Sequence, residues 1–412
     1  MIEKTAKILE KYLCNKCLGR TVSGLLSGLT DEERGKILRG IIALSIDGKS
    51  IDYSKIDPSN FYEYKFRLNK EFSDTIKKPS KCWICNDILK NLDFFAKKAI
   101  KKLKGIEFNS FLVGSKVPTD ILTREEKIWE ITSIENVESI KSEINRELGK
   151  KLGFLLNKPT DFKNPDVIVL ADLIKKDVEI QINSLYILGY YKKLVRGIPQ
   201  CKWGTPGKYK TSIQEIVAEP IMRITKGKNN AFHGMGREDV DARCLDWRPF
   251  IIEMIQPKIR NFNLKDMERQ INKSKKVKVK LIKLSNKFTV RRIKSESKDK
   301  TYKIIVKFDK PVEKRELKKL KQLVGVISQR TPVRVAHRRA DLIRKRAVKQ
   351  LNYKQINKKK IELKIKASSG LYVKELVTGD EGRTKPSVAE ILNVKAIPKD
   401  LDVIHIERPK NL

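Results

Sequence analysis

The chain has 412 residues, of which 90 are Lys or Arg and 50 are Asp or Glu, giving a formal net charge of +40. It is too long for one ordinary core, so we expect two or three domains, and so basic a chain favours a polyanionic partner such as nucleic acid. No apolar run approaches the roughly 20 residues of a membrane span, and the first residues, MIEKTAKILEKYL, lack a signal-peptide core. We therefore expect a cytoplasmic protein with no membrane partner.

Two Cys-x-x-Cys pairs occur in the first 90 residues, Cys14 with Cys17 and Cys82 with Cys85. Each such turn presents two thiolates to one metal, and two turns complete a tetrahedron. We therefore predict a structural zinc site that uses all four cysteines, in a zinc-binding region over residues 1–90. Redox activity fits less well, because neither pair follows a strand and opens a helix.

Residues 91–203 have the pattern of a small α/β unit that begins with a basic helix. The expected elements are strands at 110–115, 166–173 and 177–189 and an amphipathic helix near 136–152. The exit of this unit, GYYKKLVRGIPQCKW, interleaves tyrosines with cations. That mixture suits base stacking and phosphate contact in RNA, although a solvated strand end explains it equally well.

A cluster of acids and arginines follows two glycines in HGMGREDVDARCLDWRPF, residues 233–250. Taken alone, such a segment is most simply a polar turn whose charges pair in solvent. On an extended segment Asp239 and Asp241 would share a face and Glu238 would point away from them.

Residues 204–412 carry the clearest strands, and we expect one larger domain there. The expected elements are strands at 276–284, 301–308 and 361–368 and a helix at 313–324. Between them, SQRTPVRVAHRRADLIRKRAVKQL (328–351) is unusually rich in arginine. We expect a basic helix at 334–346 that contacts phosphates, with a solvated helix face as the alternative.

Several stretches together resemble the archaeal and eukaryotic tRNA pseudouridine synthases that act on the T-loop. The matching stretches run over nearly the whole chain in the family's order: LCNKCLGR, FLVGSKVP, YYKKLVRGIPQCKW, HGMGREDVDAR…RPF, QRTPVRVAHRRADLIRKR and GLYVKELVTGDEGRTKPSVAEIL. The resemblance implies an α+β protein in which an N-terminal zinc-binding and THUMP-containing accessory region precedes a pseudouridine synthase domain with a mixed central sheet flanked by helices. One departure is that Asp246 and Trp247 stand where the family has a small glycine-containing turn.

The resemblance also implies a reaction, the isomerisation of uridine to pseudouridine at T-loop positions 54 and 55 of tRNA, with no organic cofactor. Asp239 is the implied acid, used as nucleophile or as base. We expect Lys374 to pair with Asp239 and keep it ionised and oriented, with Arg383 as the fallback cation. Tyr372 would lie beside Lys374 on one face of an expected strand, and with Tyr302 it would hold the everted base.

The expected partner is tRNA, bound by a monomer that requires no protein partner. Both the exit of the THUMP-like unit and the basic helix are expected to grip it, because phosphate contacts dominate such binding. The cations expected to contact RNA are Lys193, Arg196, Arg334, Arg338, Arg339, Arg344 and Arg346.

Two other functions remain open at this point. A metal-dependent RNA nuclease could hold Mg²⁺ with Glu238, Asp239 and Asp241, although the intervening Arg237 and Arg243 would oppose such a site. A non-catalytic tRNA-binding protein would use the same basic surface without any chemistry.

Overall fold

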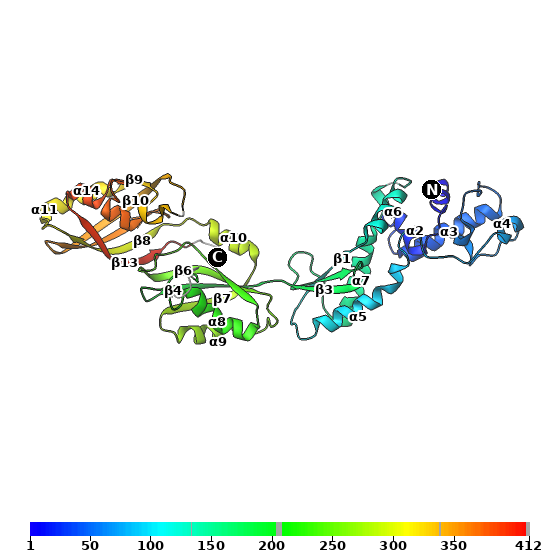
Figure 1. The fold of residues 1–412 in the computed structure, drawn as a ribbon, viewed down its shortest axis with the longest axis horizontal. Helices are drawn as coiled ribbons and strands as arrows, with labels where there is room; N and C mark the ends of the chain where they lie inside the picture. Colours follow the sequence, from blue (N-terminus) through cyan, green and yellow to red (C-terminus); the bar gives the residue numbers. More distant parts are fainter. Residues whose placement is uncertain (133, 203–207, 338, 409–412) are drawn as a thin grey trace. The chain divides into compact units, whose positions relative to one another are not determined.

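The computed structural model describes residues 1–132, 134–202, 208–337 and 339–408, and the chain divides into two compact units, Met1–Asn183 and Ser184–Leu412 (Figure 1). We had expected the second boundary at residues 203–204. It lies earlier because strand β4 (Leu185–Lys193) pairs with β6 (Arg243–Ile255) and β7 (Val277–Ser285). The tyrosine-rich exit therefore belongs to the large sheet of the second unit.

The first unit begins with short helices around the cysteines: α1 (Ile2–Ile8), α2 (Asn15–Gly19), η1 (Arg20–Val22), α3 (Asp31–Asp47), η2 (Pro58–Phe61), α4 (Lys70–Asp74) and η3 (Ile88–Asn91). The longest, α3, begins with a capping box, in which Thr30 and Glu33 each accept the other's backbone N–H. Its buried face, with Leu38, Ile42 and Ile46, packs into the apolar core of this unit.

A three-stranded sheet and its helices follow, in the order α5 (Leu92–Leu103), β1 (Phe111–Lys116), α6 (Thr119–Trp129), η4 (Ile134–Asn136), α7 (Ile140–Leu156), β2 (Val167–Asp172) and β3 (Asp177–Ile182). Strand β2 pairs with β1 in parallel and with β3 antiparallel. Helix α7 packs on β1 and α5 packs on β3. The strands predicted at 110–115 and 166–173 and the amphipathic helix are confirmed. The strand predicted at 177–189 divides, because β3 ends at Ile182 and the chain from Leu185 onward is β4, in the sheet of the second unit.

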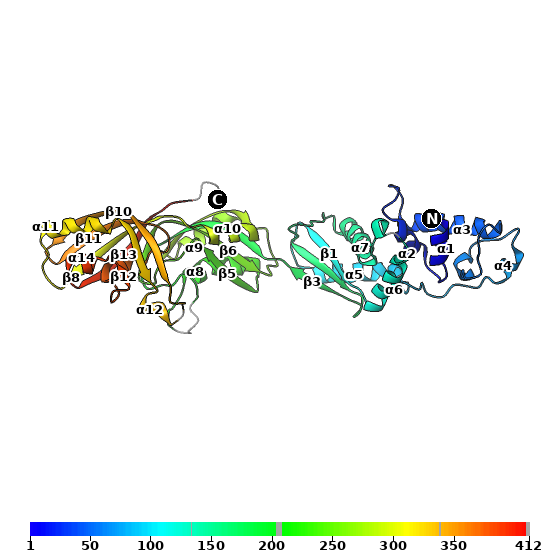
Figure 2. The same cartoon turned by 90° about the horizontal axis from the view of Figure 1, so that it is seen from above.

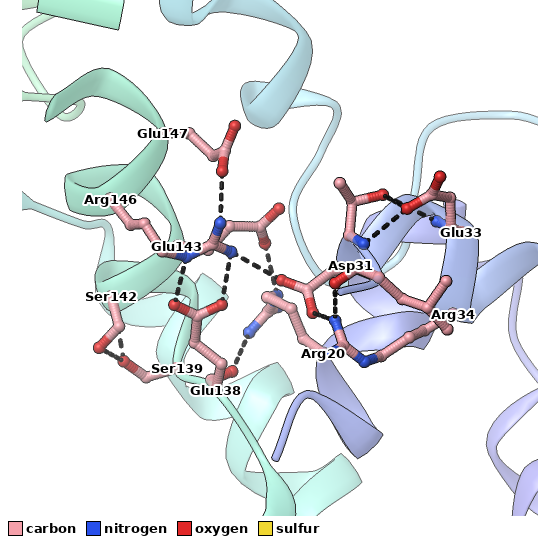
Figure 3. Close-up of polar contacts among 12 residues, drawn as sticks. Arg20, Asp31, Glu33, Arg34, Glu138, Ser139, Ser142, Glu143, Arg146 and Glu147 are labelled. Atoms are coloured by element: carbon pink, nitrogen blue, oxygen red, sulfur yellow. Dashed lines mark hydrogen bonds and ion pairs between the residues drawn. The ribbon is translucent and has the colours of Figure 1, made fainter. Parts of the chain in front are cut away.

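A network of buried ion pairs joins the cysteine region to α6 and α7. The Arg20 guanidinium pairs with Glu125, lies 2.9 Å from Glu143 Oε2 and donates to the Glu138 carbonyl oxygen over 2.8 Å. At the edge of the same network, Arg146 binds Asp31 and Glu138, as Figure 3 shows. These contacts explain why residues 1–183 form one unit.

The second unit is built on one mixed sheet in the order β12–β9–β10–β11–β8–β13–β6–β4–β7, with β5 paired to β6. The β13–β6 pairing is parallel and the other pairings are antiparallel; β10 and β11 can be followed side by side in Figure 2. The remaining strands are β5 (Asn229–Gly234), β8 (Lys300–Phe308), β9 (Gly325–Arg330), β10 (Ile343–Asn357), β11 (Lys360–Ala367), β12 (Thr384–Lys385) and β13 (Ala396–Ile406).

Helices cover this sheet in two groups. Near one end, α8 (Ile213–Thr225) and α9 (Leu264–Asn272) pack on β6 and β7, and α10 (Lys287–Ser295) contacts β5 and β6 (Figure 1). Around the other strands lie α11 (Lys314–Leu317), η5 (Lys318–Leu323), α12 (Val333–Ala336), α13 (Val373–Thr378) and α14 (Val388–Leu392). Two apolar clusters form the core, and β8 contributes Ile304, Val306 and Phe308 to one of them.

Two local predictions in this unit are wrong. The basic segment forms no helix over 334–346: α12 is one turn long, and from Ile343 onward the chain is strand β10, paired with β9. Tyr372 and Lys374 do not alternate on a strand, since Tyr372 caps α13 and Lys374 lies in its first turn. In both segments sheet pairing and packing decide the conformation over local sequence preference.

The fold class predicted from the sequence is confirmed: an α+β protein with clustered cysteines near its N-terminus and a large mixed sheet flanked by helices. None of the helices in the described residues combines the length and apolar character that crossing a bilayer requires.

Candidate active site and metal centre

A cleft of about 550 Å³ opens in the second unit, between the loop that joins β5 to β6, strand β8, helix α12 and the turn before α13. Asp239, Tyr302, Tyr372, Arg334 and Arg339 all line it. Segments separated by more than 100 residues in the sequence thus supply one concave surface.

The two neighbouring acids of this loop, Glu238 and Asp239, have different surroundings. The Glu238 carboxylate is buried, where it accepts from the Tyr191 hydroxyl over 3.0 Å and lies 3.2 Å from Arg248 Nε. Gly236, two residues earlier, has φ +74°, and a Cβ there would lie 3.3 Å from Arg248 Nη1. The glycine turn and the inward Glu238 leave Asp239 facing the cleft.

Two cations hold the backbone of this loop. The Lys193 side chain is fully buried, and its ammonium donates to the carbonyl oxygens of Asp239 and Val240 over 3.1 and 2.7 Å. Arg196 donates to the Asp241 carbonyl oxygen over 2.9 Å and pairs with Asp402. Lys193, which we had expected on RNA, has no exposed surface to offer and braces the loop instead. Arg196 also contacts the loop, but its side chain is partly exposed, so its contact with RNA stays a prediction.

The Asp239 carboxylate lies between two cations from different elements. Its Oδ2 atom is 3.4 Å from Lys374 Nζ and 3.4 Å from Arg334 Nη2. Lys374 makes its shorter contact, 2.6 Å, with Asp241, and Arg334 makes its shorter contact, 2.5 Å, with Glu375. Partial burial opposes ionisation of Asp241, but the Lys374 ammonium outweighs it and lowers the Asp241 pKa.

Two tyrosines flank the acid. Tyr302, on β8, is 9% exposed, and burial raises its pKa to about 12, so it is a neutral phenol at physiological pH. Tyr372 is half-buried, its hydroxyl accepts from Arg339 Nη1 over 2.7 Å, and the Arg334 guanidinium lies 5.9 Å from its ring centroid. The cleft therefore has one deep aromatic wall and one wall near its rim.

The remaining predicted residues lie outside the cleft. Arg383 is 3.4 Å from Asp341 and does not reach Asp239. Arg344 and Arg346 are half-buried on β10, where Arg344 donates to the Thr331 hydroxyl and Arg346 packs against Gly370. Arg338 lies outside the described residues.

The four cysteines of the first unit converge. Their sulfur atoms all lie within 4.8 Å of one another, and Cys14 Sγ is 3.8 Å from Cys85 Sγ. A zinc ion bound at about 2.3 Å to four sulfurs would separate them by about 3.8 Å. The Cys14 N–H donates to Cys82 Sγ, and Arg20 Nη2 donates to Cys17 Sγ over 3.6 Å. This donor set fits a tetrathiolate metal site, as the spacing predicted.

Comparison with known proteins agrees with this arrangement. A family model described as "Pus10, C-terminal" matches residues 186–407, more than half of the chain, and one described as "Pus10 THUMP domain, archaeal" matches residues 95–172. This chain belongs to the Pus10 family. The resemblance drawn from its motifs is thereby confirmed.

Curated Pus10 relatives align over almost their full length. "tRNA pseudouridine synthase Pus10" of Pyrococcus furiosus is 39% identical, over 98% of both chains, and its namesake from Methanothrix thermoacetophila is 37% identical, over 96% of this chain and 91% of that one. Among solved structures, the crystal structure of a Cbf5-Nop10-Gar1 complex matches 53% of this chain and 48% of that chain, with 15% identity and a TM-score of 0.31. At a TM-score of 0.31 the two structures are too different overall to support a conclusion about this chain.

Two cations of this Pus10 cleft were missed at the level of sequence. Arg248 and Lys300 both line it. Lys300 stands two residues before Tyr302, so strand alternation alone would have placed the two side chains on one face. Arg248 had no comparable signal, because nothing local marks its pairing with Glu238 ten residues earlier, and Tyr191 comes from the distant strand β4.

Proposed function

We propose that the protein isomerises uridine to pseudouridine in the T-loop of tRNA, at positions 54 and 55. The observation that carries the proposal is the Asp239 carboxylate, which faces a cleft with Tyr302 and lies 3.4 Å from each of two cations. The reaction needs an ionised carboxylate in a confined site, used as nucleophile or base, and an everted base needs an aromatic face.

The cleft residues take distinct roles in this proposal. Asp239 acts on the ribose, while Lys374 and Arg334 hold and orient its carboxylate. Tyr302 forms the deep face against the uracil, and Tyr372 lies near the rim, where the flanking nucleotides enter. Arg344, Arg346 and Arg383 belong to the same basic region around the cleft and are proposed to meet phosphates.

The test is to map pseudouridine in an unmodified tRNA transcript after incubation with the pure full-length protein. Asp239→Asn should lower the single-turnover rate by at least about 100-fold, because it removes the reacting carboxylate. Its tRNA affinity should stay within about threefold of the parent's. The neighbouring Asp241→Asn is the control and should keep most of the activity. Retained turnover in Asp239→Asn would refute the assignment.

The geometry disfavours the alternative of a metal-dependent nuclease, because the three acids do not form a Mg²⁺ site. Glu238 is buried against Arg248, and Lys374 lies against Asp239 and Asp241. In the described part of the chain, the four cysteines are the group of three or more metal-binding side chains whose ligand atoms converge. Activity that resists a chelator, with no strand scission, would separate the two functions.

We propose that the cysteine site holds structural zinc. The protein's own contribution is four sulfurs at the right separation, with N–H donors that favour their thiolate form. Elemental analysis of the purified protein should give about one zinc per chain. Cys82→Ser combined with Cys85→Ser should abolish it and destabilise the first unit, whereas Cys201→Ser, outside the cluster, should not. An unchanged zinc content in the double variant would contradict the site.

We further propose that the protein works in the cytoplasm as a monomer, without a protein partner. The support for this proposal is that the chain itself supplies Asp239, Tyr302 and Tyr372 to the cleft, and light scattering of the purified protein tests the oligomeric state.

A further inference from the structure

Lys300 is a buried cation that forms no ion pair with a carboxylate among the described residues. It begins β8, on the same side of the strand as Tyr302, and it is 6% exposed. Its ammonium donates to the Lys298 carbonyl oxygen over 3.2 Å and to the Ser369 hydroxyl over 3.1 Å. Within the described residues no carboxylate lies at salt-bridge distance from it, and the adjacent Asp299 is paired with Lys349 at 2.6 Å.

The surroundings of Lys300 make its charge costly. Behind it lies Arg248, whose own carboxylate partner is Glu238. Burial, reinforced by the Arg248 charge and opposed by Cys244 and Asp299, lowers the Lys300 pKa to about 8. A buried charge without a counter-ion is strongly disfavoured unless something pairs with it when the site is in use.

The position of Lys300 identifies what could pair with it. It lines the cleft together with Asp239 and Tyr302, and both it and Tyr302 are at least nine-tenths buried. A phosphate diester stays attached to the RNA backbone and would meet an exposed arginine of the rim, such as Arg339. A flat base with carbonyl oxygens on its edge can enter the depth beside Tyr302.

We propose that the Lys300 ammonium donates a hydrogen bond to a carbonyl oxygen of the everted uracil and stabilises the negative charge that this base acquires during the reaction. The inference rests on the proposed function and makes Lys300 a catalytic residue of the same cleft.

The charge arises from the bond that breaks. When the C1′–N1 bond opens, its electron pair stays on the base, which becomes a uracil anion with charge on its ring nitrogens and carbonyl oxygens. C1′ is left short of an electron pair. Asp239 makes up this deficit either by bonding to C1′ or by removing a proton from C2′, which lets the C2′–H electron pair form a double bond to C1′. After the base turns, C5 supplies a pair to C1′, Asp239 is released or the C2′ proton returns, C5 loses its proton and N1 gains one. The product is a neutral isomer.

The experiment measures single-turnover rates of the full-length protein at saturating tRNA. Lys300→Met should lower the rate by about 100-fold or more, as the loss of one donor to a developing anion does elsewhere, with little change in tRNA affinity. Lys300→Arg keeps the charge and should retain much of the rate. Lys307→Met, an exposed lysine on the same strand, is the matched control and should match the parent.

A second substrate tests the anion itself. In tRNA made with 5-fluorouridine, fluorine stabilises the departing base anion, and breakage of the C1′–N1 bond is followed as consumption of 5-fluorouridine after nuclease digestion. The ratio of the parent rate to the Lys300→Met rate should be at least about tenfold smaller on this substrate, because the fluorinated base anion requires less stabilisation by the protein. If Lys300→Met lowers the rate by the same factor on both substrates, the proposal is overturned. It is also overturned if Lys300→Met weakens tRNA binding but leaves the rate unchanged, since Lys300 would then contact a phosphate.

The pH profile provides an independent readout. The parent kcat/KM, measured at tRNA concentrations well below saturation, should fall as pH rises through about 8, where the Lys300 ammonium of the free protein loses its proton, and that of Lys300→Arg should stay flat there. Arg248, Cys244 and Asp299 are the charged or titratable groups that face Lys300. If the activity of Lys300→Arg falls at high pH as steeply as that of the parent, the result would count against the role of Lys300. A parent protein that makes no pseudouridine at all would instead refute the proposed function.

Discussion

At the scale of single residues, the basic character of the chain has two different uses. Some cations around the catalytic loop are structural: Lys193 is fully buried and holds two carbonyl oxygens, and Arg196 ties the loop to Asp402. Others face the cleft, among them Arg334, Arg339 and Lys300. A net charge of +40 therefore overstates the surface available to RNA, because part of it stabilises the site from within.

The bracing role of Lys193 can be tested by Lys193→Met. Two partly buried carbonyl oxygens would lose their donor, so the free energy of unfolding should fall by about 1 to 2 kcal/mol and the loop bearing Asp239 should shift. We expect single-turnover activity to fall with tRNA affinity nearly unchanged, measured by denaturant unfolding and by filter binding. Lys278→Met, an exposed lysine on β7, is the control. Weaker tRNA binding with intact stability would restore the RNA-contact interpretation.

At the scale of elements, the cysteine region and the three-stranded sheet region are connected through Arg20. The same guanidinium donates to Cys17 Sγ and pairs with Glu125 on α6 and Glu143 on α7. Glu125 also accepts from the Ile140 N–H at the start of α7. The cysteine cluster and the helices of the sheet region therefore share one buried network, and Figure 3 shows Arg20 and Glu143 of it.

This network predicts a pH dependence of local stability. Burial raises the Glu143 pKa to about 7, even though Arg20 opposes the shift. A carboxyl whose folded-state pKa lies above its unfolded value binds its proton more tightly when folded, so stability falls as pH rises from the unfolded pKa toward about 7 and is then level. Hydrogen-exchange protection of the α7 amides, corrected for the intrinsic rate, should drop by about 2 kcal/mol between pH 5.5 and 7.5.

The matched variants for this pH dependence lie on one helix. Glu143→Gln should flatten it, because no proton is exchanged at that position. Glu147→Gln, which removes a more exposed acid of α7, should leave it as in the parent. A slope that survives in Glu143→Gln would assign the effect to another group.

At the scale of the whole molecule, the division at Asn183–Ser184 separates the unit with the cysteine cluster and the THUMP domain from the unit with the cleft that contains Asp239. Strand β4 belongs to the second unit, where it lies between β6 and β7 and supplies Tyr191 and Lys193 to the catalytic loop. If the accessory and catalytic functions can be separated by cutting the chain, we expect the cut to be at Asn183–Ser184.

The division predicts different outcomes for two truncations. A fragment beginning at Ser184 should fold, keep measurable activity and bind tRNA more weakly, because it loses one RNA-binding unit. A fragment beginning at residue 204 should not fold, because it lacks β4, the strand that joins β6 to β7, and with it Tyr191, a partner of Glu238. Circular dichroism, thermal unfolding and tRNA titration distinguish the two. Equal tRNA affinity of the Ser184 fragment and the full chain would count against a docking role for the first unit.

Local patterns in the sequence were sufficient for part of this result. Alternation of apolar and charged residues determined strands β7, β8 and β11, helical spacing determined α7, and paired Cys-x-x-Cys turns determined which sulfurs converge. The family motifs identified Asp239, Tyr302 and Tyr372, which meet in one cleft. These features depend on neighbours along the chain or on short motifs, so they can be read directly.

Tertiary structure alone decided the rest, since burial and strand pairing depend on residues far apart in sequence. Pairing with β9 makes the basic segment a strand, and pairing with β6 and β7 moves β4 across the expected boundary. The fate of each cation likewise depends on distant partners: Lys193 is buried under the Asp239 loop, whereas Lys300 is buried in the cleft wall without a carboxylate. Composition counts both as positive charges, and only the packing of the chain distinguishes a brace from a group positioned to meet the substrate.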